Sequence, residues 1–400
     1  MTLDIFKRFG AIVWLIFTAT FIFALHTALP LYANSSFLSK LIPENTIGFI
    51  YTLSSLITIG VIWKFPQLLA RFGNYAVTAL FSILEIGFLL ILAFGQTPLA
   101  LIAAFVASQV LIALLAFNLD VFLEAFSSDK ETGILRGIML SAYNVAILAG
   151  PLVAGLILTN GDFWKIYLAA ALLMVPVAGI ALSKFRNFKD PEYSTITPLK
   201  TLYAIVVKKH PNDHVRHAIV ATFLLNLFYS WMVIYTPIYL YNHIGFSWEE
   251  IGVIFFVMLL PFVIFELPIG KFIDKTGLER SVMVGGFLLL IAFTGSLFFI
   301  TEPTVWLWAA LLFGTRTGAS IIEITTESYF FKHINKRDTN VLGVFRNTRS
   351  LAFIVGPLLG SLLLVFIPMQ SLFLVLASIM TLGLVNGYLM QDGKKYKQNF

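Results

Sequence analysis

The sequence predicts an all-α polytopic membrane protein with twelve transmembrane helices. Of its 400 residues, 58% are hydrophobic and 12% are Asp, Glu, Lys or Arg, whereas soluble proteins carry about 25% charged residues. So few charged side chains cannot cover a soluble particle of this size, which excludes soluble enzymes, secreted proteins and nucleic-acid-binding proteins. The apolar residues also gather in runs of about 20 residues, the length that crosses a bilayer as a helix.

Twelve apolar runs occur along the chain, in two groups of six. The runs cover residues 10–32, 47–66, 75–95, 98–124, 138–159, 163–183, 217–240, 249–270, 281–300, 303–327, 346–367 and 370–390. The two groups predict an N-terminal bundle in residues 1–183 and a C-terminal bundle in residues 217–400. The longest polar segment, residues 184–216, is predicted to be a cytoplasmic linker. The first run follows Lys7 and Arg8 without a small-residue cleavage site, so we expect it to span the membrane.

Lys and Arg residues lie almost entirely on one side of the predicted membrane. If the N-terminus is cytoplasmic, 23 of the 27 fall in cytoplasmic segments, and only Lys40 and Lys165 fall outside. The other two, Arg316 and Arg349, lie within runs. Because Lys and Arg favour the cytoplasmic side, both termini are predicted to be cytoplasmic in a protein of the cell membrane. This bias accounts for the net charge of +6 without an acidic partner such as nucleic acid.

The two halves of the chain repeat each other at corresponding positions, which predicts an internal duplication. The matching pairs are Ala19-Thr20-Phe21 with Ala221-Thr222-Phe223, Pro30 with Pro237, Ile47-Gly48 with Ile251-Gly252, Asp120 and Glu124 with Glu323 and Glu327, and Gly150-Pro151 with Gly356-Pro357.

The turn over residues 270–280 carries the pattern G-x-x-x-D-K-x-G-x-x-R. Gly270 lets one helix approach its neighbour closely, and Gly277 permits a turn with positive φ. Asp274 can accept hydrogen bonds from the N-terminus of a neighbouring helix, while Lys275 and Arg280 mark the cytoplasmic side. Together with the duplication, this turn makes nearly the whole chain resemble a twelve-helix transporter of the major facilitator superfamily.

The resemblance implies two six-helix bundles related by a pseudo-two-fold axis, with a substrate cavity between them and alternating access by rocking. The function it implies is secondary active transport of a small solute by a monomer, which we expect to be coupled to protons. In the first half, residues 67–74 occupy the place of the turn but lack its aspartate and its terminal basic pair, which puts the family's cytoplasmic latch in doubt there. No G-x-x-x-x-G-K-[ST] pattern occurs, so ATP-driven transport by this chain alone is unsupported.

Two charged residues stand near the middle of runs, where a charge costs at least about 2.5–3.5 kcal/mol on insertion scales. Arg316 has no opposite charge nearby in sequence, and the resemblance implies that its helix lines the cavity. It therefore either contacts substrate or a titrating carboxylate, or it forms a buried ion pair that locks two helices. Glu85 has no cation nearby in sequence and is a candidate proton carrier, although the family places its helix at the periphery.

Two pairs of carboxylates lie one helical turn apart, Asp120 with Glu124 and Glu323 with Glu327. Repulsion within such a pair suits proton uptake by one member. The resemblance favours another role, in which acidic residues at this depth pair with basic residues to form a cytoplasmic gate. The pairs expected for this gate are Glu327 with Arg280 or Arg346 and Glu124 with Arg136, with Arg349 in the same network.

Neutral polar residues and Gly-Pro pairs within the runs give weaker signals. The resemblance makes His26, Asn118 and Asn226 candidate substrate contacts, although such residues equally form hydrogen bonds between helices. Gly150-Pro151 resembles part of a helix 5 signature of drug/proton antiporters, but Ala146 stands where that pattern has glycine. Its recurrence as Gly356-Pro357 favours a helix bend with close packing in each half.

The kind of transport stays open at this point. The partial antiporter signature favours efflux, Arg316 favours an anionic substrate, and uptake of a metabolite or an uncoupled facilitator are alternatives. A transporter-like sensor or scaffold without net flux is the alternative from another class. A membrane enzyme would need a nucleophile, base or metal constellation, and the loops are too short to form a catalytic domain. No enzymatic activity, metal or cofactor is therefore expected, and the chain has no cysteine to ligate a metal.

Overall fold

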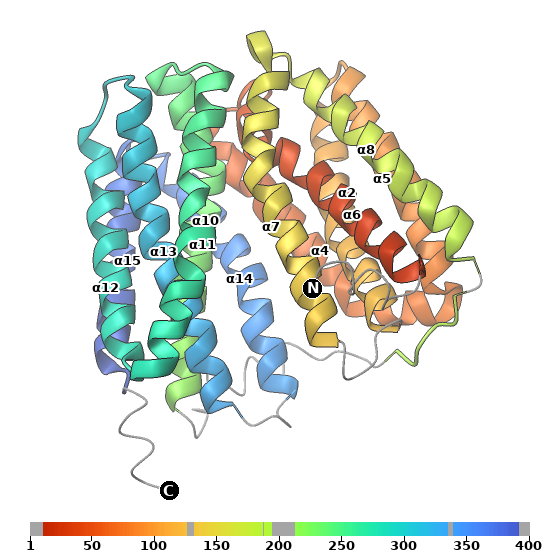
Figure 1. The fold of residues 1–400 in the computed structure, drawn as a ribbon. Coiled ribbons are helices and arrows are strands. Elements are labelled where there is room, and N and C mark those ends of the chain that lie inside the picture. Colours follow the sequence, from red (N-terminus) through yellow and green to blue (C-terminus); the bar gives the residue numbers. More distant parts are fainter. Residues whose placement is uncertain (1–10, 126–131, 187, 194–212, 335–338, 392–400) are drawn as a thin grey trace, which may run out of the picture. The chain divides into compact units, whose positions relative to one another are not determined.

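A computed structural model describes residues 11–125, 132–186, 188–193, 213–334 and 339–391. Within this part of the chain all regular structure is helical, as Figure 1 shows, and the helices form two compact units. The first unit comprises residues 1–41 and 53–196, and the second comprises residues 42–52 and 197–400.

The first unit is built from five long helices and most of a sixth. These are α2 (Ala11–Leu31), α4 (Glu44–Phe72), α5 (Asn74–Phe94), α6 (Pro98–Ala125), α7 (Thr132–Ile157) and α8 (Phe163–Lys184), with the short α3 (Asn34–Ser39) and η1 (Thr159–Gly161). Helix α2 packs against α7 and α8, and α5 packs against α6 and α8. At one end of the unit, the rings of Phe122 and Phe185 stack with centroids 4.2 Å apart.

The second unit contains six long helices. These are α10 (Asp213–Ile238), α11 (Trp248–Thr276), α12 (Glu279–Ser296), α13 (Val305–His333), α14 (Thr339–Leu363) and α15 (Ser371–Leu389), with the π-helical turn η2 (Tyr239–Ile244) and the 3-10 turn η3 (Leu297–Phe299). Helix α13 packs against α11 and α12, and α10 packs against α14. The contact of α12 with α13 needs small residues, because a Cβ atom at Gly318 would lie 2.7 Å from the carbonyl oxygen of Gly286.

The second unit also includes the start of α4. The backbone N–H of Gly48 donates a hydrogen bond of 2.8 Å to the hydroxyl oxygen of Ser361 in α14. One turn later, the hydroxyl of Thr52 donates to the carbonyl oxygen of Ile354 at 3.0 Å. Helix α4 therefore belongs to both units, with its first turns packed in the second.

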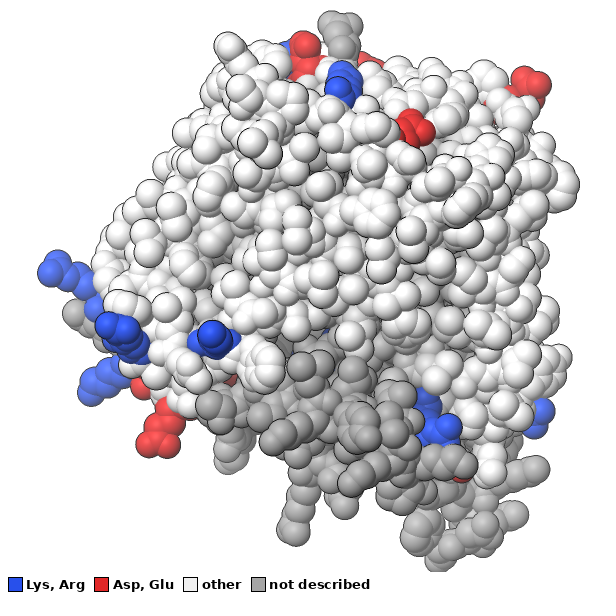
Figure 2. Space-filling view, turned by 180° about the vertical axis from the view of Figure 1, so that it is seen from behind, with Lys and Arg blue, Asp and Glu red and all other residues white. Residues whose placement is uncertain are grey.

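Eleven of the helices in the described residues are long enough and apolar enough to cross a membrane. Helix α14 covers most of the remaining predicted run, residues 346–367, but it carries Arg346 and Arg349, which lower its hydropathy below that of the others. On the face drawn in Figure 2, the Lys, Arg, Asp and Glu side chains lie toward the helix ends, and the helix lengths between them carry uncharged side chains. This all-helical arrangement confirms the predicted fold class of a polytopic membrane protein.

Candidate functional site

Arg316 lies on α13 inside the second unit, where 1% of its surface is exposed. Its guanidinium carbon lies 5.1 Å from the ring centroid of Phe228 and 5.3 Å from that of Tyr229, both on α10. Among the described residues, Nε and Nη1 have no hydrogen-bond partner, and no carboxylate oxygen lies within 4.0 Å. The aromatic faces stabilise the cation but leave the donors on Nε and Nη1 without a partner.

Tyr229 connects Arg316 to Glu323, which lies two turns further along α13. The ring of Tyr229 faces the guanidinium group, and its hydroxyl donates a hydrogen bond of 2.6 Å to Oε2 of Glu323. A single tyrosine therefore contacts both the buried cation and a half-buried carboxylate.

Further charged groups of the second unit interact with Glu323. Arg349 on α14 and Glu266 on α11 both lie close enough to Glu323 for their charges to interact. Glu327 interacts in the same way with Glu323 and with Arg346, the second of its two expected partners. Three carboxylates and three guanidinium groups, counting Arg316, thus form one roughly balanced set, which we call the α13 charge cluster.

The turn between α11 and α12 lies at one end of this unit. Gly277 adopts the left-handed conformation with φ 64°, as its position in the pattern requires. Gly270 lies against α13, where a Cβ atom would be 3.4 Å from Cγ1 of Ile324. Arg280 lies 5.9 Å from the ring of Tyr388.

Asp274 pairs with a residue that sequence reasoning missed. Its Oδ1 lies 2.9 Å from Nζ of Lys332, near the end of α13, and the same Nζ lies 3.0 Å from Oε1 of Glu279. No local signal identifies Lys332 as this partner, because 58 residues (332 − 274) separate the two in the chain.

The corresponding turn of the first unit obtains its carboxylate from elsewhere. Gly73 has φ 79°, and the backbone N–H of Asn74 donates a hydrogen bond of 2.7 Å to Oδ1 of Asp190. The hydroxyl of Tyr193 donates to the same oxygen at 2.5 Å. Asp190 thus places a negative charge at the N-terminus of α5, where the sequence pattern of this turn lacks an aspartate.

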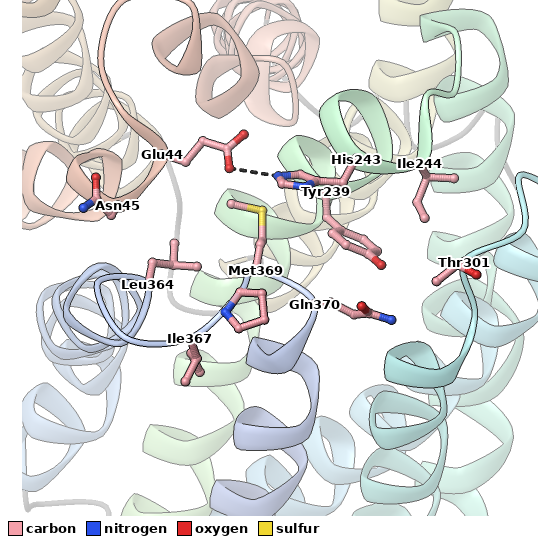
Figure 3. A pocket seen from close by; sticks show the side chains of 11 residues that line it. Glu44, Asn45, Tyr239, His243, Ile244, Thr301, Leu364, Ile367, Met369 and Gln370 are labelled. Atoms are coloured by element: carbon pink, nitrogen blue, oxygen red, sulfur yellow. Dashed lines mark hydrogen bonds and ion pairs between the residues drawn. The ribbon is translucent and has the colours of Figure 1, made fainter.

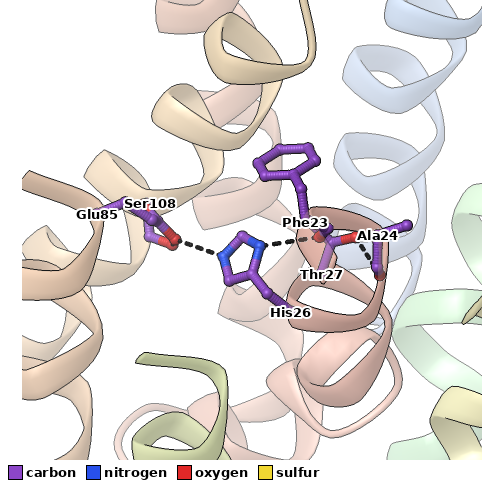
Figure 4. A network of polar contacts seen from close by, with 6 residues as sticks. All are labelled: Phe23, Ala24, His26, Thr27, Glu85 and Ser108. Carbon is purple, nitrogen blue, oxygen red and sulfur yellow. Dashed lines mark hydrogen bonds and ion pairs between the residues drawn. The ribbon is translucent and has the colours of Figure 1, made fainter. Parts of the chain in front are cut away.

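A second buried polar cluster lies in the first unit (Figure 4). It contains His26 and Glu85, which the sequence alone does not link to each other. Nε2 of His26 on α2 lies 3.1 Å from Oε1 of Glu85 on α5, and Ser108 on α6 donates to the same oxygen at 2.7 Å. Nδ1 of His26 lies 3.0 Å from the carbonyl oxygen of Phe23. His26 and Glu85 are fully buried and Ser108 is 3% exposed. Glu85, which has no cation nearby in sequence, has a histidine beside it in the fold.

The remaining polar candidates differ in their surroundings. Asn118 is fully buried, and neither polar atom of its side chain has a hydrogen-bond partner among the described residues. Asn226 donates to the carbonyl oxygen of Thr222 in its own helix at 2.8 Å. Asp120 and Glu124 are exposed near the end of α6. The side chain of Arg136, the expected partner of Glu124, lies outside the described residues.

Both Gly-Pro pairs lie at close contacts between helices of one unit. A Cβ atom at Gly150 would be 2.8 Å from the carbonyl oxygen of Ala28, and one at Gly356 would overlap the hydroxyl of Ser230. The carbonyl oxygen of Gly356 also accepts a hydrogen bond of 2.6 Å from Nε1 of Trp231, and that of Pro357 accepts one of 2.7 Å from Tyr235. These contacts favour the helix-packing interpretation of Gly150-Pro151 and Gly356-Pro357.

A pocket of about 560 Å³ lies in the second unit near the start of α11, whereas Asp274 lies near the end of that helix. Figure 3 shows the residues that line the pocket. Its wall includes Glu44, whose carboxylate accepts a hydrogen bond of 2.8 Å from Nδ2 of Asn242 and lies 2.9 Å from Nε2 of His243. Its other lining residues are Asn45, Tyr239, Ile244, Thr301, Leu364, Ile367, Pro368, Met369 and Gln370. Sequence analysis missed this pocket because its walls come from distant segments. Within the described residues, no group of three or more His, Asp or Glu side chains could hold a metal ion.

Comparison with known proteins identifies the family. The model of the Major Facilitator Superfamily matches residues 12–339 and, in a second match, residues 218–399. Two crystal structures of the nucleoside transporter NupG, one of them of a substituted variant, are similar to this chain with TM-scores of 0.75 and 13% sequence identity. They cover 94% and 96% of this chain and 98% and 100% of their own chains. No curated protein matches the chain in sequence. Because the family model matches most of its length, the chain belongs to the Major Facilitator Superfamily.

Proposed function

We propose that the chain is a secondary active transporter that moves a small solute across the cell membrane by alternating access. In this proposal an anionic group of the solute binds Arg316, and transport is coupled to protons. The chain acts as a monomer in the bilayer, with both termini in the cytoplasm, and has no enzymatic activity. The observation that carries the proposal is a buried guanidinium group with free donors.

The free donors of Arg316 favour an anionic ligand. A buried polar group without a hydrogen bond costs about 1–3 kcal/mol, and more if it is charged. A carboxylate or phosphate group can accept hydrogen bonds from a guanidinium group in the geometry that makes arginine the common ligand of such anions. An anion bound to Arg316 would remove this cost, so binding energy is available at this site.

Glu323 gives the site a way to respond to the solute. Its carboxylate accepts the hydrogen bond from Tyr229, and the ring of Tyr229 faces Arg316. An incoming anion therefore meets a second negative charge near the same cation. Protonation of Glu323 removes this competition, so anion binding at Arg316 should be tighter at low pH.

A nucleoside is the second candidate solute, because the NupG structures are those of a nucleoside transporter. Nucleosides carry no charge at neutral pH, so a nucleoside would not need Arg316 as an anion ligand. Transport of an anion should therefore require Arg316 as a ligand, whereas transport of a nucleoside should not. Uncoupled facilitation, efflux in place of uptake, and a sensor without net flux are the other outcomes that transport measurements distinguish.

The test uses the purified full-length chain in liposomes, with and without an imposed pH gradient. Labelled uridine, adenosine, lactate, succinate and glucose 6-phosphate are the probes for counterflow. We expect counterflow of an anionic probe, faster with the gradient and lost in Arg316→Ala. Arg71→Ala is the matched control, because Arg71 is an exposed arginine at the end of α4.

The outcomes separate the alternatives. Counterflow of a nucleoside that survives Arg316→Ala would contradict the anion assignment and leave a transporter. Counterflow that ignores the gradient would indicate a facilitator or coupling to another ion. An absence of counterflow for all five probes would contradict the proposed solute classes and favour the sensor.

A further inference from the structure

The first unit contains a buried histidine–glutamate pair, and no other charged group contacts it among the residues whose side chains the structure describes. His26 and Glu85 contact each other, Ser108 and the backbone of Phe23. The titratable groups on the helices packed against α2 and α5 are Asp120 and Glu124 on α6, Arg136 and Tyr143 on α7, and Lys165, Tyr167 and Lys184 on α8. Of these, Tyr167 donates to Asn34 and Lys165 pairs with Asp162. Within the described side chains, the direct contacts of the pair are thus a neutral hydroxyl and a backbone carbonyl.

The backbone contact fixes where one histidine hydrogen lies. A carbonyl oxygen can only accept, so the contact of 3.0 Å with Phe23 requires a hydrogen on Nδ1 of His26. In a neutral imidazole with this tautomer, Nε2 is a bare acceptor. Nε2 then faces Oε1 of Glu85 at 3.1 Å, and two lone pairs would point at each other unless a proton lies between them.

One proton at this contact makes the pair neutral. If it is bonded to Nε2, the pair is an imidazolium and a carboxylate, and if it is bonded to Oε1, the pair is an imidazole and a carboxylic acid. The total charge is zero in both forms. Loss of the proton leaves one negative charge in an apolar surrounding, which is unfavourable without water or a cation.

Glu85 also has an atom through which the proton can leave. Its second oxygen, Oε2, is buried and has no hydrogen-bond partner among the described residues. A carboxyl oxygen buried in this way weakens the fold, so a purely structural role does not account for it. Rotation of the Glu85 carboxylic acid about its Cγ–Cδ bond exchanges the two oxygens and brings the protonated oxygen to the position of Oε2. A water molecule that reaches this position can accept the proton, which forms a hydronium ion and leaves a neutral His26 beside a Glu85 carboxylate.

We propose that His26 and Glu85 form a proton-binding site, and that the proton held between Nε2 and Oε1 is the one coupled to solute movement. The proton-binding site itself does not depend on the proposed transport function. Only the coupling of this proton to solute movement rests on that function. Solute binding and proton binding then take place at separate places, with the solute at Arg316 and the proton in the first unit.

The first experiment needs no solute. In protein labelled with nitrogen-15 histidine, the resonances of His26 are assigned by their loss in His26→Gln. We expect Nδ1 to carry a hydrogen and Nε2 to share a proton with Glu85 at neutral pH. In Glu85→Gln, Nε2 should become an ordinary bare acceptor. A wild-type Nε2 that shows no shared proton, or ring nitrogen resonances that do not change in Glu85→Gln, would overturn the site.

The second experiment tests the coupling. The double variant His26→Gln/Glu85→Gln cannot bind the proton but keeps neutral hydrogen-bonding side chains. We expect counterflow at equal pH to persist, while accumulation driven by a pH gradient falls to an inside-to-outside ratio of about one, because a facilitator only equilibrates its solute. His217→Gln/Glu249→Gln makes the same two changes in the second unit and should accumulate solute like the wild type.

Failure of this inference is distinct from failure of the proposed function. Gradient-driven accumulation that persists in the double variant would overturn the coupling role, while transport itself stands. Wild-type counterflow that ignores the gradient would overturn it too. If the wild type moves none of the five probes, the proposed function fails, and the histidine resonances still decide whether the proton site exists.

Discussion

The backbone N–H of Gly48 lies 2.8 Å from the hydroxyl oxygen of Ser361, so α4 and α14 touch at a residue without a side chain. A Cβ atom at Gly48 would overlap the carbonyl oxygen of Pro357 and the hydroxyl of Tyr235. The backbone of Gly48 is helical and could be adopted by any residue. Glycine is therefore needed here because a side chain would not fit, and not because of its backbone conformation. This contact holds the start of α4 in the second unit.

Gly48→Ala should destabilise the protein by about 1–3 kcal/mol, the usual range for overpacking. Gly60→Ala is the matched control, because Gly60 lies in the same helix with nothing within 4 Å of its added Cβ. That variant should be neutral or more stable by about 0.5–1 kcal/mol, since alanine favours helix. Thermal unfolding of both variants checks this. Equal melting temperatures would contradict the close contact.

Asp190→Ala should lower the free energy of unfolding by about 0.3–1 kcal/mol, the worth of a negative charge at an exposed helix N-terminus. The physical reason is the lost hydrogen bond from the backbone of Asn74. Glu192→Ala removes an exposed carboxylate two residues away and should have no effect. Denaturant unfolding compares the two variants, and equal losses would show that Asp190 does not cap α5.

The phenol of Tyr193 should titrate at unusually high pH. Burial, the hydrogen bond to Asp190 and the charge of that carboxylate raise the pKa of Tyr193 above its ordinary value. The folded state then binds the phenol proton more tightly than the unfolded state. The resulting stability is complete below about pH 10 and is lost as pH rises through the folded pKa. Phenolate absorbance, with Tyr193→Phe as the reference, should show a lower pKa in Asp190→Asn.

Lys332→Ala should destabilise the second unit by about 1–3 kcal/mol, the cost of removing a partner from a buried polar group. Lys332 contacts Asp274 and Glu279, and Glu279 is only 1% exposed. Adding Glu279→Gln should restore part of the loss, because a neutral amide is easier to bury. Lys271→Ala removes an exposed lysine nearby and should change stability by less than about 0.5 kcal/mol. A double-mutant cycle without coupling would contradict the pairing.

The helices could be predicted from the sequence because the hydrophobic runs match the thickness of a bilayer. The turn geometry at Gly277 followed from a local rule, since glycine adopts positive φ most easily. Contacts between helices could not be predicted in this way. His26 and Glu85 are separated by 59 residues (85 − 26), and no periodicity within α2 or α5 indicates which faces meet.

In the candidate site, too, local features could be predicted from the sequence and contacts between helices could not. Arg316 could be singled out because charge within an apolar run is costly. Its contact with the rings of Phe228 and Tyr229 depends on how α10 packs against α13, which hydropathy does not determine. The role of Asp190 could not be predicted either, because the linker supplies a carboxylate that the local pattern of the turn lacks.

The orientation of the chain can be tested with single cysteines, because the natural sequence has none. Lys275 lies before α12 and Thr301 lies after it, so one membrane crossing separates them. Lys and Arg gather on the side of Lys275, which predicts that this side is cytoplasmic. In intact cells, a membrane-impermeant maleimide should label Thr301→Cys, and it should label Lys275→Cys only after permeabilisation. The reverse pattern would place both termini outside, and labelling of both variants in intact cells would contradict the crossing by α12.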